Sequence, residues 1–141
     1  MPANAAVYLP STKISLQGLP KITAQKGSTS KSDAYFEFDV GDDKVRLSAM
    51  PGEQIPGHLQ GFTGYVNSLP ATDEQKEEAT SLLQQTKLVL GLHTDGDFDS
   101  NPDIWKTLLT LAKSNGGFVF AFNSVIDTNG DVIIGPPQNA G

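Results

Sequence analysis

Residues 87–122 decide the fold of this chain and read KLVLGLHTDGDFDSNPDIWKTLLTLAKSNGGFVFAF. The segments 87–93 and 118–122 are apolar runs of strand length, typical of strands that are buried on both faces. Between them, Asn101 and Pro102 suit the first positions of a helix, and a Gly-Gly pair suits its end. A strand, a helix and a strand with short links form a β-α-β unit, so we expect the two strands to be adjacent and parallel.

Two hairpins are predicted on either side of this unit. Polar and apolar side chains alternate over residues 35–40 and 44–50, which predicts a hairpin, 35–50, with the three-residue link 41–43. Residues 124–135 contain an Asn-Gly pair between two short apolar runs, the strongest short-range signal for a hairpin.

Two helices are predicted between the first hairpin and the β-α-β unit. Residues 53–68 carry apolar side chains three and four positions apart, which favours an amphipathic helix. Thr72 and Gln75 then match a capping box, and the acids that follow Thr72 complement the positive end of a helix dipole.

The N-terminal third is the least regular part. Residues 5–9 suit a short edge strand ended by a proline, and residues 13–17 suit a half-buried strand. Residues 25–32 are rich in Gly and Ser and predict a mobile loop, and residues 136–141 predict a frayed tail.

Together these segments predict a single α+β domain over residues 1–141. We expect a mixed sheet of about five to seven strands that includes the hairpin 35–50, the β-α-β unit 87–122 and the hairpin 124–135. About three helices should pack mainly on one face of this sheet.

The composition limits the classes of function. The chain has no cysteine, which excludes disulfide frameworks, Cys-ligated zinc, iron–sulfur clusters and thiol catalysis. All sixteen acids but only six of the ten basic residues lie beyond residue 31, and the formal net charge is −6. A nucleic-acid partner would need a clustered basic face, so we expect none. Without a long apolar run or a secretory signal, we expect a cytoplasmic protein with no membrane partner.

The Asp-rich segment after the strand 87–93 raises the question of a metal. Asp95, Asp97 and Asp99 have the spacing of the first three ligands in a calcium loop. The sixth position of that loop is Ser100 instead of glycine, and the twelfth is Lys106 instead of a bidentate Glu. His93 with two of these aspartates could also hold a transition metal, but no zinc-binding helix motif supports it. We therefore expect no metal and no cofactor.

The same segment suits a partner-binding surface. Four acids lie within nine residues, with an aromatic side chain among them, and the set is Asp95, Asp97, Phe98, Asp99 and Asp103. Such a patch favours a basic protein partner. A solvated acidic turn with a helix cap remains open, as do the turn 41–43 and the helix start 73–78 as other acidic contact surfaces.

Catalytic motifs are missing from the sequence. It holds no nucleophile elbow and no phosphate-binding loop, and its two histidines and one arginine are few for acid–base catalysis. We expect a non-enzymatic binding protein. The alternative is a small enzyme or ligand-binding domain with a site at the strand end near His93 and Asp95.

One pattern resembles a known family. The residues Val45-x-Leu47-x-x-Met50-Pro51-x-x-x-Ile55-Pro56, followed by two helices and the strand 88–92, are similar to an uncharacterised bacterial family, the domain of unknown function 4261. The resemblance implies no catalytic residues. Small acidic α+β bacterial proteins of this kind look like immunity proteins, which neutralise a toxin by covering its active site.

Overall fold

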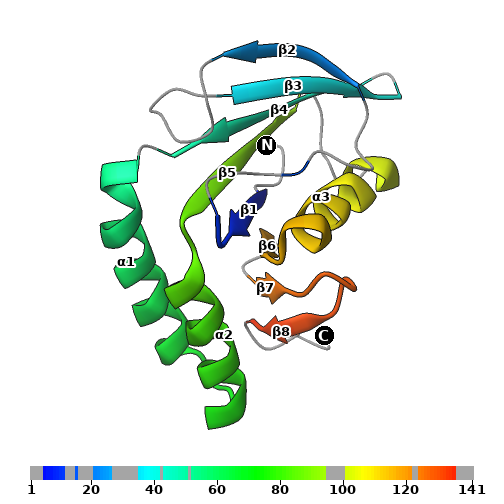
Figure 1. Ribbon diagram of the computed structural model, residues 1–141. Helices are drawn as coiled ribbons and strands as arrows, with labels where there is room; N and C mark the ends of the chain where they lie inside the picture. The colour runs from blue at the N-terminus through cyan, green and yellow to red at the C-terminus, as the bar shows by residue number, and fades with distance from the viewer. Residues whose placement is uncertain are drawn as a thin grey trace.

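The computed structural model describes residues 5–11, 15, 21–26, 35–41, 43–50, 52–94, 101–121 and 124–135. Eight strands within these ranges form one sheet in which every neighbouring pair is antiparallel (Figure 1). In spatial order they are β2 (Ile22–Lys26), β3 (Tyr35–Val40), β4 (Asp43–Ala49), β5 (Leu88–Thr94), β1 (Ala5–Leu9), β6 (Phe118–Ala121), β7 (Ser124–Ile126) and β8 (Val132–Ile134).

Helices cover both faces of this sheet (Figure 1). On one face lie α1 (Ile55–Ser68), which follows the 3-10 turn η1 (Gly52–Gln54), and α2 (Asp73–Gln85); on the other lies α3 (Pro102–Asn115). In β1, Val7 and Leu9 join the core under α3, whereas Tyr8 between them joins the core under α1 and α2. The expectation that the helices pack mainly on one face is not met, because strands with consecutive buried residues need a layer on each side.

The α+β class is confirmed, but the arrangement of the β-α-β unit differs from the prediction. β5 and β6 are joined by α3 and run in the same direction, since both are antiparallel to β1. They are not adjacent, because β1 lies between them. The sheet is therefore antiparallel rather than mixed, and the expectation that residues 5–9 form an edge strand is wrong. The physical reason is that Val7 and Leu9 are fully buried and Tyr8 is 3% exposed, so β1 needs cover on both faces and both edges.

Both predicted hairpins are confirmed. In the first, Val40 pairs with Asp43, so the link has two residues instead of three, and Gly41 adopts a φ of 62° that other residues rarely adopt. In the second, the amides of residues 129 and 131 donate to the Asp127 carboxylate, and Gly130 has a φ of 88°.

The N-terminal predictions are tested only in part. Residues 25 and 26 belong to β2, so the loop prediction is wrong for them, and residues 27–32 lie outside the described residues. The strand predicted at 13–17, apart from Ser15, and the tail 136–141 also lie outside the described residues.

The predicted helix caps of α2 and α3 are confirmed. The Thr72 hydroxyl accepts a hydrogen bond from the Gln75 amide at 3.1 Å, and the Gln75 side chain accepts one from the Thr72 amide at 3.0 Å. The Asn101 side chain accepts from the Asp103 amide at 3.1 Å, and Gly116 ends α3 with a φ of 71°.

Candidate functional site

The described residues on either side of the predicted partner-binding segment both lie next to the β3–β4 hairpin. Asp95, Asp97, Phe98 and Asp99 lie outside the described residues, but the residues on either side are placed. Thr94 ends β5 opposite Val45 of β4. Asn101 donates hydrogen bonds from its side-chain amide to the Val40 carbonyl at 3.1 Å and to the Asp43 carboxylate at 2.8 Å. Thr94 and Asn101 therefore both lie beside the β3–β4 hairpin.

Asp103 is described and is exposed in the first turn of α3. Because Asn101 joins the start of α3 to Asp43, the carboxylates of Asp43 and Asp103 belong to one region of the molecule. We call the region around Asp43, Asn101 and Asp103 the α3-end surface. The sequence predicted Asp103 and the turn 41–43 as separate acidic contact surfaces, and the structure places Asp43 and Asp103 in the same region.

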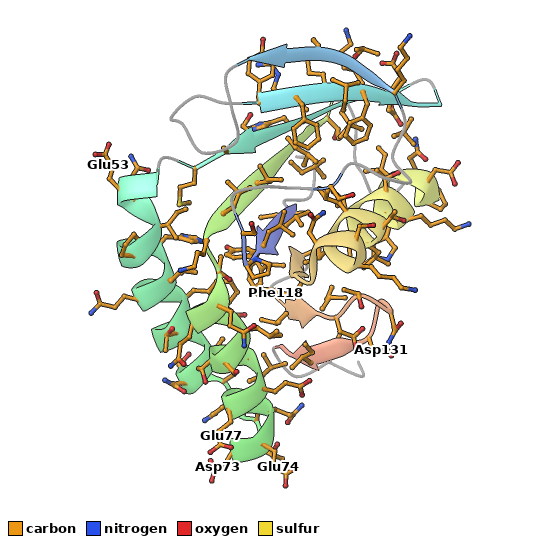
Figure 2. The ribbon with its side chains drawn as sticks, viewed as in Figure 1. Glu53, Asp73, Glu74, Glu77, Phe118 and Asp131 are labelled. Atoms are coloured by element: carbon orange, nitrogen blue, oxygen red, sulfur yellow. The ribbon has the colours of Figure 1, made fainter. Side chains whose placement is uncertain are left out.

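A second group of acids lies elsewhere. Asp73, Glu74, Glu77 and Glu78 are exposed in the first two turns of α2. Figure 2 shows Asp73, Glu74 and Glu77 at the N-terminal end of α2, well away from the start of α3. The Gln75 side chain fixes this end of α2 by donating to the Ile133 carbonyl at 3.1 Å.

Among the described residues, the ion pair Glu37–Arg46 is the only one. Glu37 is 6% exposed, and its carboxylate accepts from Nε of Arg46 at 3.0 Å and from Nη2 as well. The Arg46 guanidinium also lies over the Tyr35 ring, 4.2 Å from the ring centre. These contacts hold the only arginine of the chain on the sheet face that α1 and α2 leave uncovered over β3 and β4.

His93, the strand-end residue of the alternative hypothesis, lies opposite Arg46 on β5 and is exposed. It lines an open hollow of about 450 Å³ together with Glu37, Lys44, Arg46, Ser48 and Thr94. Sequence reasoning found His93 from its position at a strand end. It missed the cationic neighbours, because they come from β4 by cross-strand pairing.

A second polar pair lies under α1. The Tyr8 hydroxyl is 2.7 Å from Nε2 of His58, and the Tyr8 ring stacks on Phe118 with ring centres 4.9 Å apart. Burial raises the pKa of Tyr8 well above its ordinary value. The hydroxyl therefore stays protonated and shares a hydrogen bond with His58, and a phenolate nucleophile is disfavoured at this position.

Two further features bear on the sequence predictions. No group of three His, Asp or Glu side chains within the described ranges could hold a metal ion, and the Asp95–Asp97–Asp99 set is outside those ranges. None of the described helices is long and apolar enough to cross a membrane.

No family model, curated protein or solved structure matches the chain. The resemblance to the domain of unknown function 4261 therefore stays a prediction, and function is inferred from the geometry described above.

Proposed function

We propose that this chain is a non-catalytic binding protein that binds a basic protein partner through the α3-end surface. The residues proposed to contact the partner are Asp95, Asp97, Phe98, Asp99 and Asp103. Within this proposal, the class that suits a small acidic α+β protein is a bacterial immunity or inhibitor protein that neutralises a toxin in the cytoplasm.

The observation that carries the proposal is the pair of hydrogen bonds from Asn101. They join Asn101, at the start of α3, to the β3–β4 turn, while Thr94 at the end of β5 pairs with β4. Asp43 and Asp103 are therefore presented from a part of the fold that is already ordered, and a pre-organised surface loses less conformational freedom when a partner binds. This supports a binding surface at this end of α3.

The charge of the chain supports the same proposal. Acids outnumber basic residues, and among the described carboxylates only Glu37 forms an ion pair. Unpaired carboxylates on one surface accelerate association with a basic partner, and salt weakens this effect.

The described acid–base groups support a non-catalytic role. Tyr8 is hydrogen-bonded to His58, and Glu37 is committed to Arg46. Each of these contacts has a structural purpose, since each satisfies a buried polar group.

Association kinetics test the proposal. A partner is first captured on the immobilised chain from a lysate of the source cells, identified by mass spectrometry and purified. Its association rate is then measured at two salt concentrations for the wild type and for the variant D95N/D97N/D99N/D103N. We expect this variant to associate at least tenfold more slowly and with a smaller salt dependence, because charges at an interface act mainly on the association rate.

The acids of α2 provide a matched control. The variant E74Q/E77Q/E78Q removes a similar number of charges from the other acidic region, where these side chains are exposed. We expect its association rate to stay close to that of the wild type. Equal slowing by both variants would indicate a general charge effect, and slowing by the α2 variant alone would move the interface to α2; either result contradicts the proposal.

A further inference from the structure

The chain contains two Asn-Gly pairs, Asn115-Gly116 and Asn129-Gly130. An asparagine that precedes glycine is prone to lose its side-chain nitrogen as ammonia. Glycine has no side chain to keep its amide nitrogen away from the side-chain carbonyl carbon of the asparagine. The two pairs share this local chemistry, so the sequence alone does not distinguish them, but their surroundings in the fold differ.

Asn115 is held by three hydrogen bonds at the end of α3. Its side-chain nitrogen donates to the Leu111 carbonyl at 2.9 Å and to the Ser15 carbonyl at 3.0 Å. Its side-chain oxygen accepts a hydrogen bond from the Ser15 amide at 2.7 Å. Both donors and one acceptor position of this side chain are therefore in use. Deamidation at Asn115 requires these bonds to break, so the fold protects this residue.

Asn129 lies in the turn of the β7–β8 hairpin, and its side chain is exposed. Its main-chain amide donates to the Asp127 carboxylate at 2.9 Å. Its side-chain amide, in contrast, forms no hydrogen bond with any residue that the structure describes. No described contact therefore keeps the Asn129 side chain from turning toward the Gly130 nitrogen.

The turn around Asn129 has to open before the two groups can react. The Gly130 amide donates to the Asp127 carbonyl at 3.0 Å, and the Asp131 amide donates to the Asp127 carboxylate at 3.0 Å. Opening is local, because β7 and β8 have three residues each and β8 lies at the edge of the sheet. A short hairpin at a sheet edge opens more readily than the end of a 14-residue helix that contributes four residues to the core.

We infer that Asn129 is a modification site at which the folded chain deamidates, and that Asn115 is protected. The Gly130 nitrogen forms a bond to the side-chain carbonyl carbon of Asn129, and the bond from that carbon to Nδ2 breaks. The Gly130 proton passes through water to the leaving nitrogen, which departs as ammonia. Water then opens the resulting cyclic imide at one of its two carbonyl carbons, which gives aspartate or isoaspartate. This site goes beyond the proposed protein partner and does not depend on it.

Either product changes the hairpin. Aspartate at this position adds a third carboxylate to a turn that already holds Asp127 and Asp131. Isoaspartate inserts one extra carbon into the main chain between residues 129 and 130. Because the length of the turn sets the register of a hairpin, isoaspartate disturbs the pairing of β7 with β8.

Ageing of the full chain at neutral pH, followed by peptide mapping with mass spectrometry, tests the inference. In the folded chain we expect Asn129 to deamidate at least about tenfold faster than Asn115, whose hydrogen bonds must break first. In urea that unfolds the chain, the two rates should agree within about threefold, because the protecting contacts are lost. Equal rates in the folded chain, no measurable reaction at Asn129, or a tenfold difference that persists in urea would each overturn the inference.

A matched pair of variants tests the opening of the turn. D127A removes the carboxylate that binds the amides of residues 129 and 131, whereas D131A removes an exposed carboxylate from the same turn (Figure 2). We expect D127A to accelerate deamidation of Asn129 at least about threefold and D131A less than about twofold, with Asn115 unchanged in both. If D131A accelerates it as much as D127A, charge and not opening of the turn sets the rate, which contradicts the inferred route. Circular dichroism checks that each variant is folded.

Discussion

Gly117 and Gly61 show how differently two glycines serve the same fold. A β-carbon at Gly117 would clash with the Tyr8 carbonyl oxygen, because the start of β6 passes directly against β1. A β-carbon at Gly61 would meet no atom within 4 Å. The first glycine is required by close packing, whereas the second lowers the helix propensity of α1 and has no packing reason.

Substitution of each glycine by alanine should therefore change the free energy of unfolding in opposite directions. G117A should lower the free energy of unfolding by about 1–3 kcal/mol, the usual range for overpacking. G61A should raise it by about 0.5–1 kcal/mol, because alanine is the better helix former. Urea unfolding of both variants measures the two shifts, and shifts of the same sign would contradict the packing described for Gly117.

The Glu37–Arg46 pair gives a second prediction for single residues. R46M leaves the Glu37 carboxylate buried without its cation, which should lower the free energy of unfolding by about 1–3 kcal/mol. The double variant E37L/R46M removes both charges and should recover most of that loss. Urea unfolding compares the three proteins. A double variant as unstable as R46M would mean that packing, and not the buried charge, causes the loss.

At the scale of elements, Asn101 and Thr72 are both N-caps, but only Asn101 also joins two elements. N101S keeps a capping hydroxyl and loses the bonds to Val40 and Asp43, so it should lower the free energy of unfolding by about 1–3 kcal/mol. T72S keeps the whole capping box and should change it by less than about 0.5 kcal/mol. Thermal unfolding measures both. Equal stability of N101S and T72S would contradict a stabilising link between the start of α3 and the β3–β4 turn.

The elements that the sequence predicted well are those with local signals. The capping box, the Asn-Pro helix start and the two hairpins depend on residues a few positions apart, so pattern and turn chemistry predicted them. β2 carries the residues ITAQK, which do not alternate, and it was missed. The candidate site follows the same division: His93 was found from its place at a strand end, whereas the Tyr8–His58 contact joins residues 50 positions apart and has no local signal.

At the scale of the whole molecule, the position of β1 in the sheet was the main feature that the sequence could not predict. β1 has only five residues and is followed by a proline, and both features favour a position at the edge of a sheet. Its partners β5 and β6 are distant in the chain, and only their register shows that β1 lies between them. A β-α-β unit that leaves room for a third strand has the same local signals as one that does not.

Proline substitutions test this topology. V7P removes a ladder donor from the middle of the sheet and should prevent folding. T23P lies in edge strand β2 at a register shift, where Thr23 has no paired residue. It should lower the free energy of unfolding by about 1 kcal/mol, because the hydrogen bond from the Thr23 hydroxyl to the Glu37 carbonyl is lost. Circular dichroism and thermal unfolding distinguish the two. If V7P folds as well as T23P, β1 is not a central strand.

Hydrogen exchange of the chain with and without its captured partner is the most direct test of the proposed binding surface. We predict slower exchange in the complex for amides at the β3–β4 turn and for residues 95–103, with little change over residues 73–78 at the start of α2. Slower exchange confined to the start of α2, or to α1, would contradict the α3-end surface as the site of partner binding.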